Sequence, residues 1–396
     1  MRLLVVQETD WLQRGPHQQH HLFEQLSERG HEVIVVDFEI LYTPWPKTPL
    51  LAPRMEWNNV SRANPKARIR VIRPLTIRLP GIARITSLVT FYSEIARMAR
   101  SVRPDLIVDY AISTGASALL LARSKRIPFV MHIIDSLHTL APHKWTWPLA
   151  RSFEAQLLRS ADATIYISEK LREYGVSLGA RSDTAYKIST GVDLNRFHPD
   201  RDGIEIRHKW NIADDDVLLV FVGWIYDFSG VDTIMHALPD LPANLKLLVV
   251  GDGEAEERLH DLQDSLGLHE RVVFVGQQEY DRMPNFMTAA DVCVMYSDLN
   301  PITRNIIPIK TFEYMACGRP VLASELPGVM CEVPPGNGII YTKKGELANA
   351  LQRLLDPSIR EREGAKARTF VQEHYDWSKL TDRFEEVLSS IVAPEK

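Results

Sequence analysis

The feature that most constrains this chain is an end-to-end alternation of short apolar segments with longer segments of helical spacing. Apolar runs such as Met1–Gln7 and Asp105–Ala111 read as strands that are buried on both faces. Segments such as His17–Arg29 place apolar residues three and four positions apart, as one face of a helix requires. Strands separated by helices in this way are typical of a parallel sheet covered on both sides, so we expect an α/β fold.

The alternation stops once, at Gly191–Asp200 (GVDLNRFHPD), and resumes with the apolar run Val217–Gly223. The interruption is polar, contains Gly, Asn and Pro, and has no periodicity, so we interpret it as a linker. We therefore expect two Rossmann-like domains facing a cleft, an N-terminal one over 1–190 and a C-terminal one over 201–375. A break in the last helical tract near Trp377 suggests that 376–396 is a C-terminal helix that crosses back to the N-terminal domain.

Composition excludes several classes of protein. Hydrophobic residues make up 45% and charged residues 24% of 396 residues, with a formal net charge of −5, which fits a soluble globular chain rather than a nucleic-acid binder. No apolar run is long enough to span a membrane, and the first one is too short for a signal-peptide core. The three cysteines lack the spacing of a zinc or redox motif, so we expect reduced thiols in the cytoplasm.

The stretch 54–103 differs from the rest of the chain in charge. It holds eleven basic and two acidic residues, with apolar side chains such as Trp57 and Phe91 between them. We interpret it as a region that holds the protein at an anionic membrane surface. The same composition also fits a solvated arginine-rich face or a site for another polyanionic partner. The residues between Phe38 and Ala67 show no periodicity, and we expect them to be irregular.

The most informative segment is NPITRNIIPIKTFEYMACGRPVLASELP, which spans 300–327. We expect a helix to begin near Ile309, so that its first N–H groups and the positive end of its dipole can bind a pyrophosphate. Lys310 in the first turn adds a cation. Glu313, three residues later, lies on the same helix face and could accept hydrogen bonds from ribose hydroxyls.

This segment resembles the C-terminal domain of the large family of retaining glycosyltransferases with the GT-B fold, in the branch whose helix begins Pro-x-Lys. The matching positions are Pro308, Lys310, Glu313, Tyr314, Met315, Ala316, Gly318, Pro320 and Val321. Further stretches that resemble this domain are FVGWIYDFSGVD (Phe221–Asp232), LLVVGDGEAEERL (Leu247–Leu259), FVGQ (Phe274–Gln277) and AADVCVMYS (Ala289–Ser297). GVDLNRFHP resembles the linker of the family. The resemblance covers 185–360 and extends more loosely into the N-terminal half.

The resemblance implies that the C-terminal domain binds a nucleoside diphosphate sugar. Lys310 and the start of its helix would stabilise the leaving diphosphate, and Glu313 would fix the ribose. The donor-binding residues that it implies are Gly223, Trp224, Gly253, Gln277, Arg304, Ile309, Lys310 and Glu313.

Three positions depart from the family pattern. Many members have a glutamate eight residues before the position of Glu313, where this chain has Asn305, whose amide can hydrogen-bond a sugar hydroxyl but carries no charge. Trp224 and Ser229 stand where many members have an Arg and a Lys that bind the donor phosphates. Arg304 and Lys310 are the cations that could replace them. We keep Asn305, with Lys310 and Asp135, as a candidate catalytic residue.

Acceptor-side candidates come from the loop TDWLQRGPHQQHH after the first strand. Gly15 permits a tight loop, and the family places a glycine-containing loop here, so Arg14 and Gly15 are candidates. His17 is a third candidate, for an acceptor contact. His17, His20 and His21 could share one helix face as metal ligands, but no Cys or carboxylate accompanies them and the family usually needs no metal, so we expect no metal site.

A second acceptor-side segment is HIIDSLH, at the end of the apolar run Pro128–Asp135. Many relatives have His-Asp here. This chain keeps Asp135 and has Ile134 in place of the histidine, so His132 and His138 are candidate substitutes. Asp135 could equally be a helix N-cap. The turn Ser113–Gly115 has N–H groups that could hold an anion or form a plain cap.

We therefore expect a metal-independent hexosyltransferase that works with retention and without a cofactor. Its partners would be a nucleotide-sugar donor, a lipid-linked or glycan acceptor and an anionic membrane, and we expect no nucleic acid. It would be cytoplasmic, at the inner face of the membrane. A non-catalytic nucleotide-sugar-binding subunit that supports an active partner is the alternative that Asn305, Trp224 and Ser229 suggest. Another GT-B enzyme, such as an epimerase or a glycogen-type synthase, is a third.

Overall fold

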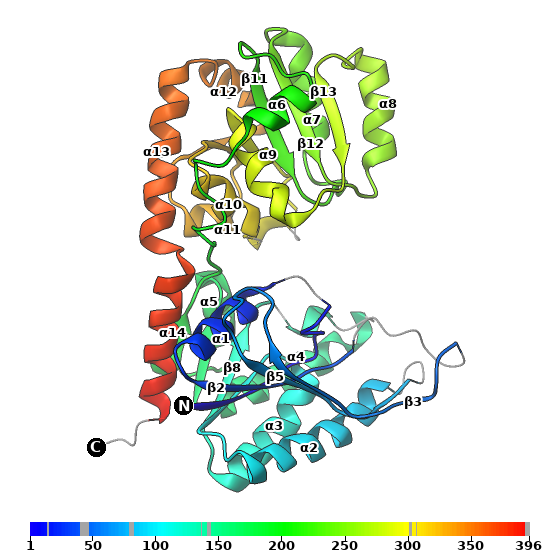
Figure 1. Cartoon of the computed structure of the whole chain (residues 1–396), viewed down its shortest axis with the longest axis vertical. Coiled ribbons are helices and arrows are strands. Elements are labelled where there is room, and N and C mark those ends of the chain that lie inside the picture. Colours follow the sequence, from blue (N-terminus) through cyan, green and yellow to red (C-terminus); the bar gives the residue numbers. More distant parts are fainter. Residues whose placement is uncertain are drawn as a thin grey trace. The chain divides into compact units, whose positions relative to one another are not determined.

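The structure is a computed structural model of the whole chain (Figure 1). It describes residues 1–13, 16–39, 47–78, 83–135, 137–140, 144–300, 303–305 and 307–392, and of residues 83–85, 139, 140, 144, 305 and 344 the backbone alone. The chain divides into two compact units. Unit 1 comprises Met1–Thr190 and Ser378–Lys396, and unit 2 comprises Gly191–Trp377.

Unit 1 is built on one sheet with the strand order β10-β9-β8-β7-β1-β2-β5-β4. Its strands are β1 (Arg2–Val6), β2 (Glu32–Val36), β4 (Met55–Val60), β5 (Ile69–Arg73), β7 (Leu106–Asp109), β8 (Phe129–Ile133), β9 (Ala163–Tyr166) and β10 (Ala185–Lys187). The pairs are parallel except that β4 runs antiparallel to β5. The central strands are buried along their length, as their apolar sequences predict.

Helices cover both faces of this sheet. The helices α2 (Ala83–Ser101), α3 (Ile112–Lys125), α4 (Trp147–Ser160) and α5 (Glu169–Ser177) contribute to one core, and α2, α3 and α4 pack side by side (Figure 1). The helices α1 (Gln18–Glu28) and α14 (Trp377–Val392) contact each other through Phe23 and Phe384, whose ring centroids lie 5.4 Å apart. Glu385 of α14 also pairs with His31 at 2.7 Å. These contacts attach α14 to unit 1.

Unit 2 has an all-parallel sheet with the order β13-β12-β11-β14-β15-β16. Its strands are β11 (Val217–Val222), β12 (Leu245–Val250), β13 (Val272–Gly276), β14 (Val292–Met295), β15 (Val321–Ser324) and β16 (Ile339–Thr342). Its helices are α6 (Ile204–Lys209), α7 (Val231–Ala237), α8 (Glu256–Leu266), α9 (Met283–Ala289), α10 (Ile309–Ala316), α11 (Pro327–Glu332), α12 (Leu347–Arg353) and α13 (Pro357–His374). Two buried clusters, one on each face, form its core.

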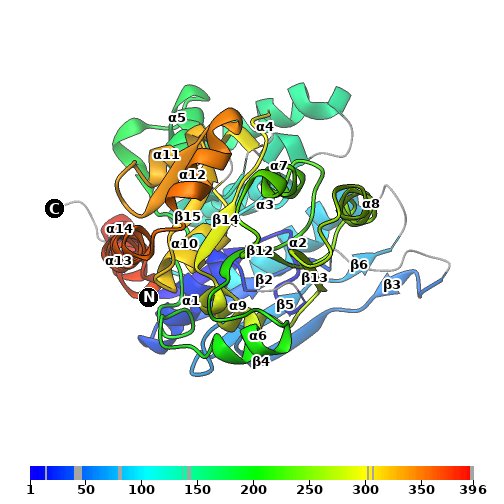
Figure 2. The same cartoon turned by 90° about the horizontal axis from the view of Figure 1, so that it is seen from above.

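The expectation that the residues between Phe38 and Ala67 are irregular is wrong in part. β4 pairs with β5, and the short strands β3 (Leu51–Ala52) and β6 (Thr76–Ile77) form a separate two-stranded sheet (Figure 2). The sequence did not predict β4, because its residues are mostly exposed and apolar residues do not alternate along it. Seven short 3-10 turns complete the described part: Leu137–Leu140, Lys144–Thr146, Ser182–Thr184, Leu238–Asp240, Tyr280–Arg282, Thr303–Asn305 and Lys344–Glu346. None of the described helices is both long and apolar enough to cross a membrane.

Candidate functional site

The helix α10 is tied to the end of strand β11 by a buried tyrosine. The backbone N–H of Val222 donates a hydrogen bond to the hydroxyl oxygen of Tyr314 at 2.8 Å. α10 begins at Ile309 after an extended Pro308, and no side chain caps its start. The Thr311 N–H already donates to the Pro308 carbonyl oxygen at 3.0 Å. The N–H groups of Ile309 and Lys310 are the ones that the described part of the chain leaves to a ligand, at the positive end of the helix dipole.

Lys310 lies in the first turn at this end of α10. Its Nζ atom lies 3.9 Å from the ring centroid of Phe221, the fifth residue of β11. A Cβ atom at Gly223 would lie 3.3 Å from the same Nζ, so glycine at this position leaves room for the ammonium group. Burial lowers the pKa of Lys310 to about 7, against the opposing effect of Glu313. Lys310 forms no ion pair within the described part of the chain, so the site favours an anionic ligand.

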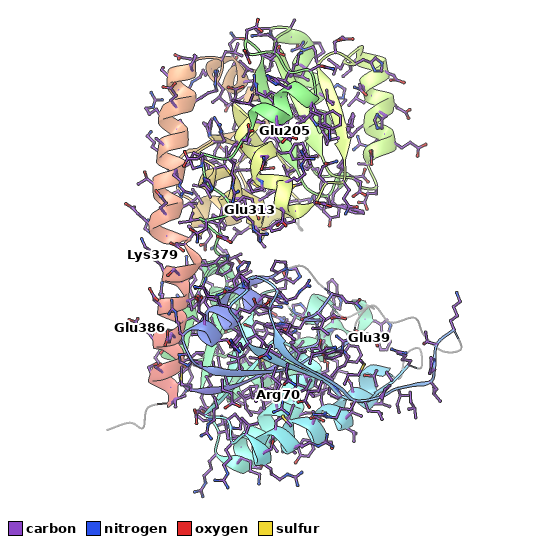
Figure 3. All side chains as sticks on the ribbon, viewed as in Figure 1. Glu39, Arg70, Glu205, Glu313, Lys379 and Glu386 are labelled. Carbon is purple, nitrogen blue, oxygen red and sulfur yellow. The ribbon has the colours of Figure 1, made fainter. Side chains whose placement is uncertain are left out.

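Glu313 lies one helical turn from Lys310 and is 7% exposed. The Tyr280 hydroxyl donates a hydrogen bond to its Oε1 at 2.8 Å. Burial raises the pKa of Glu313 to about 7, while Tyr280 and Lys310 act in the opposite direction. The tyrosine thus engages one of the two carboxyl oxygens of Glu313. Glu313 is labelled on α10 in Figure 3.

Tyr280 and Arg196 are parts of this site that the sequence analysis missed. The Arg196 guanidinium lies 5.1 Å from the Tyr280 ring centroid and pairs with Asp281 at 3.1 Å. Arg196 therefore packs on the ring of Tyr280, whose hydroxyl is bonded to Glu313. The only sequence signal was the position of Arg196 inside GVDLNRFHP, and nothing in the local sequence points to Tyr280.

Two glycines at the end of β12 allow its loop to touch the loop after β11. Gly251 and Gly253 have φ values of +135° and +159°. A Cβ at Gly251 would overlap the carbonyl oxygen of Gly223, and one at Gly253 would overlap the backbone of Ile225. Ile225 donates to the Asp252 carbonyl oxygen at 2.8 Å. The two loops thus pack backbone against backbone beside Lys310, which side chains at these positions would prevent.

The loop after β11 explains two of the departures from the family pattern. Ser229 is 6% exposed, and its Oγ accepts a hydrogen bond from the backbone N–H of Tyr226 at 2.8 Å. Ser229 therefore closes the loop rather than facing a ligand. Trp224 is 51% exposed at the other end of the loop, and Tyr226 stacks on Phe228 at 4.8 Å. An exposed aromatic side chain thus stands where many relatives have a cation.

The remaining donor-side candidates lie on loops at the same edge of the sheet of unit 2. Gln277 is exposed directly after β13, and Arg304 is exposed in the turn Thr303–Asn305 that follows β14. Ile309 is 39% exposed as the first residue of α10. Asn305 is described by its backbone alone. The structure thus brings Gly223 and Lys310 into contact, one helical turn from Glu313, and places Gln277 and Arg304 on other loops at this edge of the sheet.

In unit 1, Asp135 follows strand β8 and is exposed as a residue, while the surrounding chain partly desolvates its carboxyl group. Burial raises the pKa of its carboxyl. It lies at the carboxyl end of a parallel strand, which is where ligands of such sheets bind. Arg14 and Gly15 lie outside the described residues.

The loop after β1 is anchored by a buried charge network. Arg73 of β5 pairs with Asp10 at 2.9 Å and with Asp37 at 2.7 Å, and both carboxylates are fully buried. Asp10 also accepts hydrogen bonds from the backbone N–H groups of Leu12 and Gln13 at 2.9 and 3.0 Å. The network fixes the first half of the loop on the ends of three strands.

His20 connects Trp11 with His17. Its Nδ1 accepts from the backbone N–H of His17 at 3.1 Å, so its Nε2 must donate to the Trp11 carbonyl oxygen, 3.0 Å away. Burial lowers the pKa of His20 to about 3, which keeps the ring neutral. With both nitrogens engaged, His20 cannot join His17 and His21 around a metal ion. Among the described residues no group of three or more His, Cys, Asp or Glu is arranged to hold one.

His132 does not fit an acceptor contact. It is fully buried, its Nδ1 lies 2.7 Å from the Tyr110 hydroxyl, and its ring lies between Tyr110 and Phe384 of α14. Burial lowers its pKa to about 3. His138 lies 2.9 Å from both the Glu154 carboxylate and the Tyr174 hydroxyl. Each histidine thus serves the interior of unit 1.

The turn Ser113–Gly115 is an internal cap rather than an open anion site. The backbone N–H of Thr114 donates to Glu8 at 3.2 Å, and its hydroxyl donates to the buried Asp109 at 3.1 Å. Asp109 also accepts from the backbone N–H of Ala111 at 3.0 Å. The Thr114 N–H and hydroxyl are thus occupied by carboxylates of the chain, and the Gly115 N–H donates to the Ala111 carbonyl oxygen at 3.2 Å.

The basic tract 54–103 is largely neutralised by ion pairs. Six of its basic residues pair with acids, some of which, such as Glu39, come from outside the tract. The pairs are Arg54–Glu56, Arg54–Glu94, Lys66–Glu28, Arg70–Glu56, Arg73–Asp10, Arg73–Asp37, Arg78–Glu39 and Arg97–Glu94. Figure 3 labels Glu39 and Arg70. The count of charges along the sequence therefore overstates the positive charge that this region could present to a membrane.

Models of two protein families match the two halves of the chain. Residues 202–388 match Glycosyl transferases group 1, and residues 18–196 match Glycosyltransferase Family 4. Among curated proteins, a GDP-mannose-dependent monoacylated alpha-(1-6)-phosphatidylinositol monomannoside mannosyltransferase of Corynebacterium glutamicum is 27% identical over 307 residues, 74% of this chain and 79% of the relative. The GDP-mannose-dependent alpha-(1-6)-phosphatidylinositol monomannoside mannosyltransferase of Mycolicibacterium smegmatis is 26% identical over 351 residues, 84% of this chain and 88% of the relative.

Solved structures share the fold over the whole chain. Anabaena Alr3699/HepE in complex with UDP has a TM-score of 0.73 at 19% identity and covers 98% of this chain and 100% of its own. The sucrose-phosphate synthase of Thermosynechococcus elongatus has a TM-score of 0.73 at 20% identity, with both chains covered completely. At these identities the likeness establishes the fold and nothing finer.

Proposed function

We propose that this chain, which is built from a Glycosyltransferase Family 4 domain and a Glycosyl transferases group 1 domain in the GT-B fold, transfers a hexosyl group from a nucleoside diphosphate sugar. The acceptor is a lipid-linked or glycan hydroxyl, and the anomeric configuration is retained. One observation carries the proposal: Lys310, at the uncapped start of α10, lies against Gly223 without an ion-pair partner among the described residues.

Unit 2 provides the groups that a departing nucleoside diphosphate needs. In the reaction the acceptor oxygen forms a bond to the anomeric carbon, the bond from that carbon to the diphosphate breaks, and the diphosphate keeps the electron pair. Lys310 and the first N–H groups of α10 stabilise the charge that develops there. Glu313, held by Tyr280, accepts hydrogen bonds from the ribose, and the exposed ring of Trp224 gives an apolar contact beside it.

Unit 1 supplies the acceptor side of the proposal, with Asp135 as its main candidate. The pKa of Asp135 is raised by burial, which makes its carboxylate a better acceptor for the proton of an incoming hydroxyl. Arg14, Gly15 and His17, in the segment after β1, stay as further candidates. His132 and His138 are not retained, because the interior of unit 1 already engages them.

The proposal needs neither a metal ion nor a cofactor. The positive charge that a metal would bring to the diphosphate comes instead from Lys310, with the exposed Arg304 on the neighbouring loop. The non-catalytic alternative is not favoured, because the named relatives are transferases along most of their length. Their names also specify phosphatidylinositol mannosides, which supports an acceptor at a lipid surface.

A panel of nucleotide sugars, offered with and without crude polar lipids, tests this function through the release of nucleoside diphosphate. We expect one donor to be turned over, with release increased by the lipid fraction that contains the acceptor. Lys310→Ala should abolish this release. Lys209→Ala is the matched control, since Lys209 also lies over an aromatic ring, 5.4 Å from the Trp210 centroid, but away from α10. Equal loss in both variants, or no donor turned over, would reject the proposal.

A further inference from the structure

A buried carboxylate of α4 binds the loop that follows β8. Glu154 is fully buried, and its Oε1 accepts a hydrogen bond from the backbone N–H of Leu137 at 3.3 Å. Its Oε2 accepts one from the backbone N–H of His138 at 3.4 Å. These are the first two N–H groups of the turn Leu137–Leu140, so a side chain from another helix caps that turn.

Two side chains donate to the same carboxylate. The Nδ1 of His138 lies 2.9 Å from Oε2, and because a carboxylate carries no hydrogen, this nitrogen must be the donor. The Tyr174 hydroxyl of α5 also donates to Oε2, at 2.9 Å. The His138 ring packs on the rings of Tyr174 and Trp147, with centroids 5.9 and 6.0 Å away. The loop is thus bound to α4 through its backbone and through its histidine side chain.

A carboxylate is an expensive group to place in the interior of α4. A buried charge is costly unless hydrogen bonds satisfy it, and an apolar side chain could fill the same space at lower cost. Three of the four donors to Glu154 belong to residues 137 and 138 of the loop. Glu154 therefore serves the position of this loop rather than the general packing of the helix.

The loop that Glu154 binds also carries Asp135. Asp135 lies two residues before Leu137, between the end of β8 and the turn Leu137–Leu140. β8 fixes this short segment on one side and Glu154 fixes it on the other. The Asp135 carboxyl therefore has little freedom to move while both attachments are in place.

We propose that Glu154 is a positioning residue for glycosyl transfer, which holds the loop after β8 so that Asp135 can accept the proton of the acceptor hydroxyl. As the acceptor oxygen forms its bond to the anomeric carbon, that proton passes to the Asp135 carboxylate. The inference rests on the proposed function, in which Asp135 is the acceptor-side group. It adds a residue of α4 that touches no substrate and acts through the loop alone.

A double-mutant cycle in the full chain tests this role. Glu154→Gln replaces one accepting oxygen by an amide nitrogen, and it should lower kcat by about ten- to a hundredfold, as misplacement of a reacting group does. The KM for the donor should stay unchanged, because the donor contacts lie in unit 2. The double variant with Asp135→Asn should be no slower than Asp135→Asn alone, since both residues act in one step. Multiplication of the two losses would overturn the proposal.

Leu158→Ala is the matched control for a loss of stability. Leu158 lies one turn from Glu154 on α4 and is 1% exposed, and its apolar side chain cannot hydrogen-bond to the loop. This substitution leaves a cavity and should lower the melting temperature at least as much as Glu154→Gln does, with kcat nearly unchanged. An equal loss of kcat in the two variants would give Glu154 a role in stability only and overturn the inference.

Amide hydrogen exchange without any substrate measures the attachment of the loop independently of transfer. In Glu154→Gln the N–H groups of Leu137 and His138 should exchange about tenfold faster or more, and those within β8 should not change. Unchanged exchange at Leu137 and His138 would overturn the proposal even if kcat falls. If the wild type turns over no donor, the proposed function fails, and with it the role of Glu154 in transfer, even where faster exchange in the variant shows that Glu154 holds the loop.

Discussion

Units 1 and 2 treat buried charge in opposite ways at the ends of their sheets. In unit 1, Arg73 is satisfied by Asp10 and Asp37, and these charges hold a loop. In unit 2, Lys310 and Glu313 both have pKa values moved by burial to about 7, and Lys310 has no ion pair among the described residues. The difference teaches that similar Rossmann-like sheets can use charge for internal structure in one half and keep it for a ligand in the other.

The largest expected effect breaks the network of unit 1. Arg73→Gln leaves two carboxylates buried without their cation, which should lower the free energy of unfolding by about 3–5 kcal/mol. Arg70→Gln, on the same strand, removes a half-exposed partner of Glu56 and should cost less than about 1 kcal/mol. Chemical unfolding of both variants measures the contrast, and similar losses would show that the Arg73 network is not what holds unit 1.

The second prediction is a loss of activity that is not accompanied by a loss of stability. Lys310→Ala should lower kcat/KM for the donor by about a hundredfold or more, as the loss of a group that stabilises a leaving anion does. Its melting temperature should stay equal or rise, because a charge desolvated in the empty site has been removed. Donor kinetics and thermal unfolding of the same preparation give both values. A fall in melting temperature that parallels the fall in activity would make Lys310 a structural residue like Arg73.

The third prediction uses the neutral histidine inside unit 1. Unfolded histidine binds a proton near its ordinary pKa of about 6.5, whereas burial lowers the pKa of His132 in the folded protein to about 3. Between these pH values the unfolded state binds more protons, so stability falls as pH falls, by up to about 2 kcal/mol at pH 5 for this residue. His132→Leu should weaken this acid sensitivity. An unchanged pH dependence would show that His132 does not titrate on unfolding.

The smallest expected effect is a shift in the pKa of Glu313 in unit 2. The Tyr280 hydrogen bond stabilises the carboxylate form of Glu313, so Tyr280→Phe should raise the pKa of that carboxyl further. The acid limb of kcat/KM against pH should then move to higher pH by about one unit. The alkaline limb, set by Lys310, should stay in place. Movement of both limbs together would mean that Tyr280 acts by distorting α10 rather than through Glu313.

The sequence predicted the features that lie in one continuous segment of the chain. It missed contacts between residues that are far apart in the sequence. The α/β alternation gave the fold class, and the segment from Pro308 to Pro320 gave Lys310 and Glu313, because one short helix carries both. Tyr280 and Arg196 could not be found in this way, since they reach Glu313 from distant parts of the chain. The charge of the basic tract was overestimated from the sequence, because acids outside the tract, such as Glu28 and Glu39, pair with its basic residues.

His132 shows a different limit. In a parallel sheet covered on both sides, alternate residues of a strand all face packed helices, so alternation along β8 does not tell a ligand-facing residue from a core one. Only the position of α14, the last helix of the chain, shows that His132 is covered by Phe384.

The most direct test of the difference between the units is the affinity of the protein for a nucleoside diphosphate as a function of pH. Titration calorimetry with UDP, GDP and ADP should find one nucleotide whose affinity falls as pH rises above about 7, where free Lys310 loses its proton. Lys310→Arg should keep that affinity at high pH, because arginine stays charged. The same pH profile in both proteins would contradict the account, since the diphosphate would then not depend on Lys310.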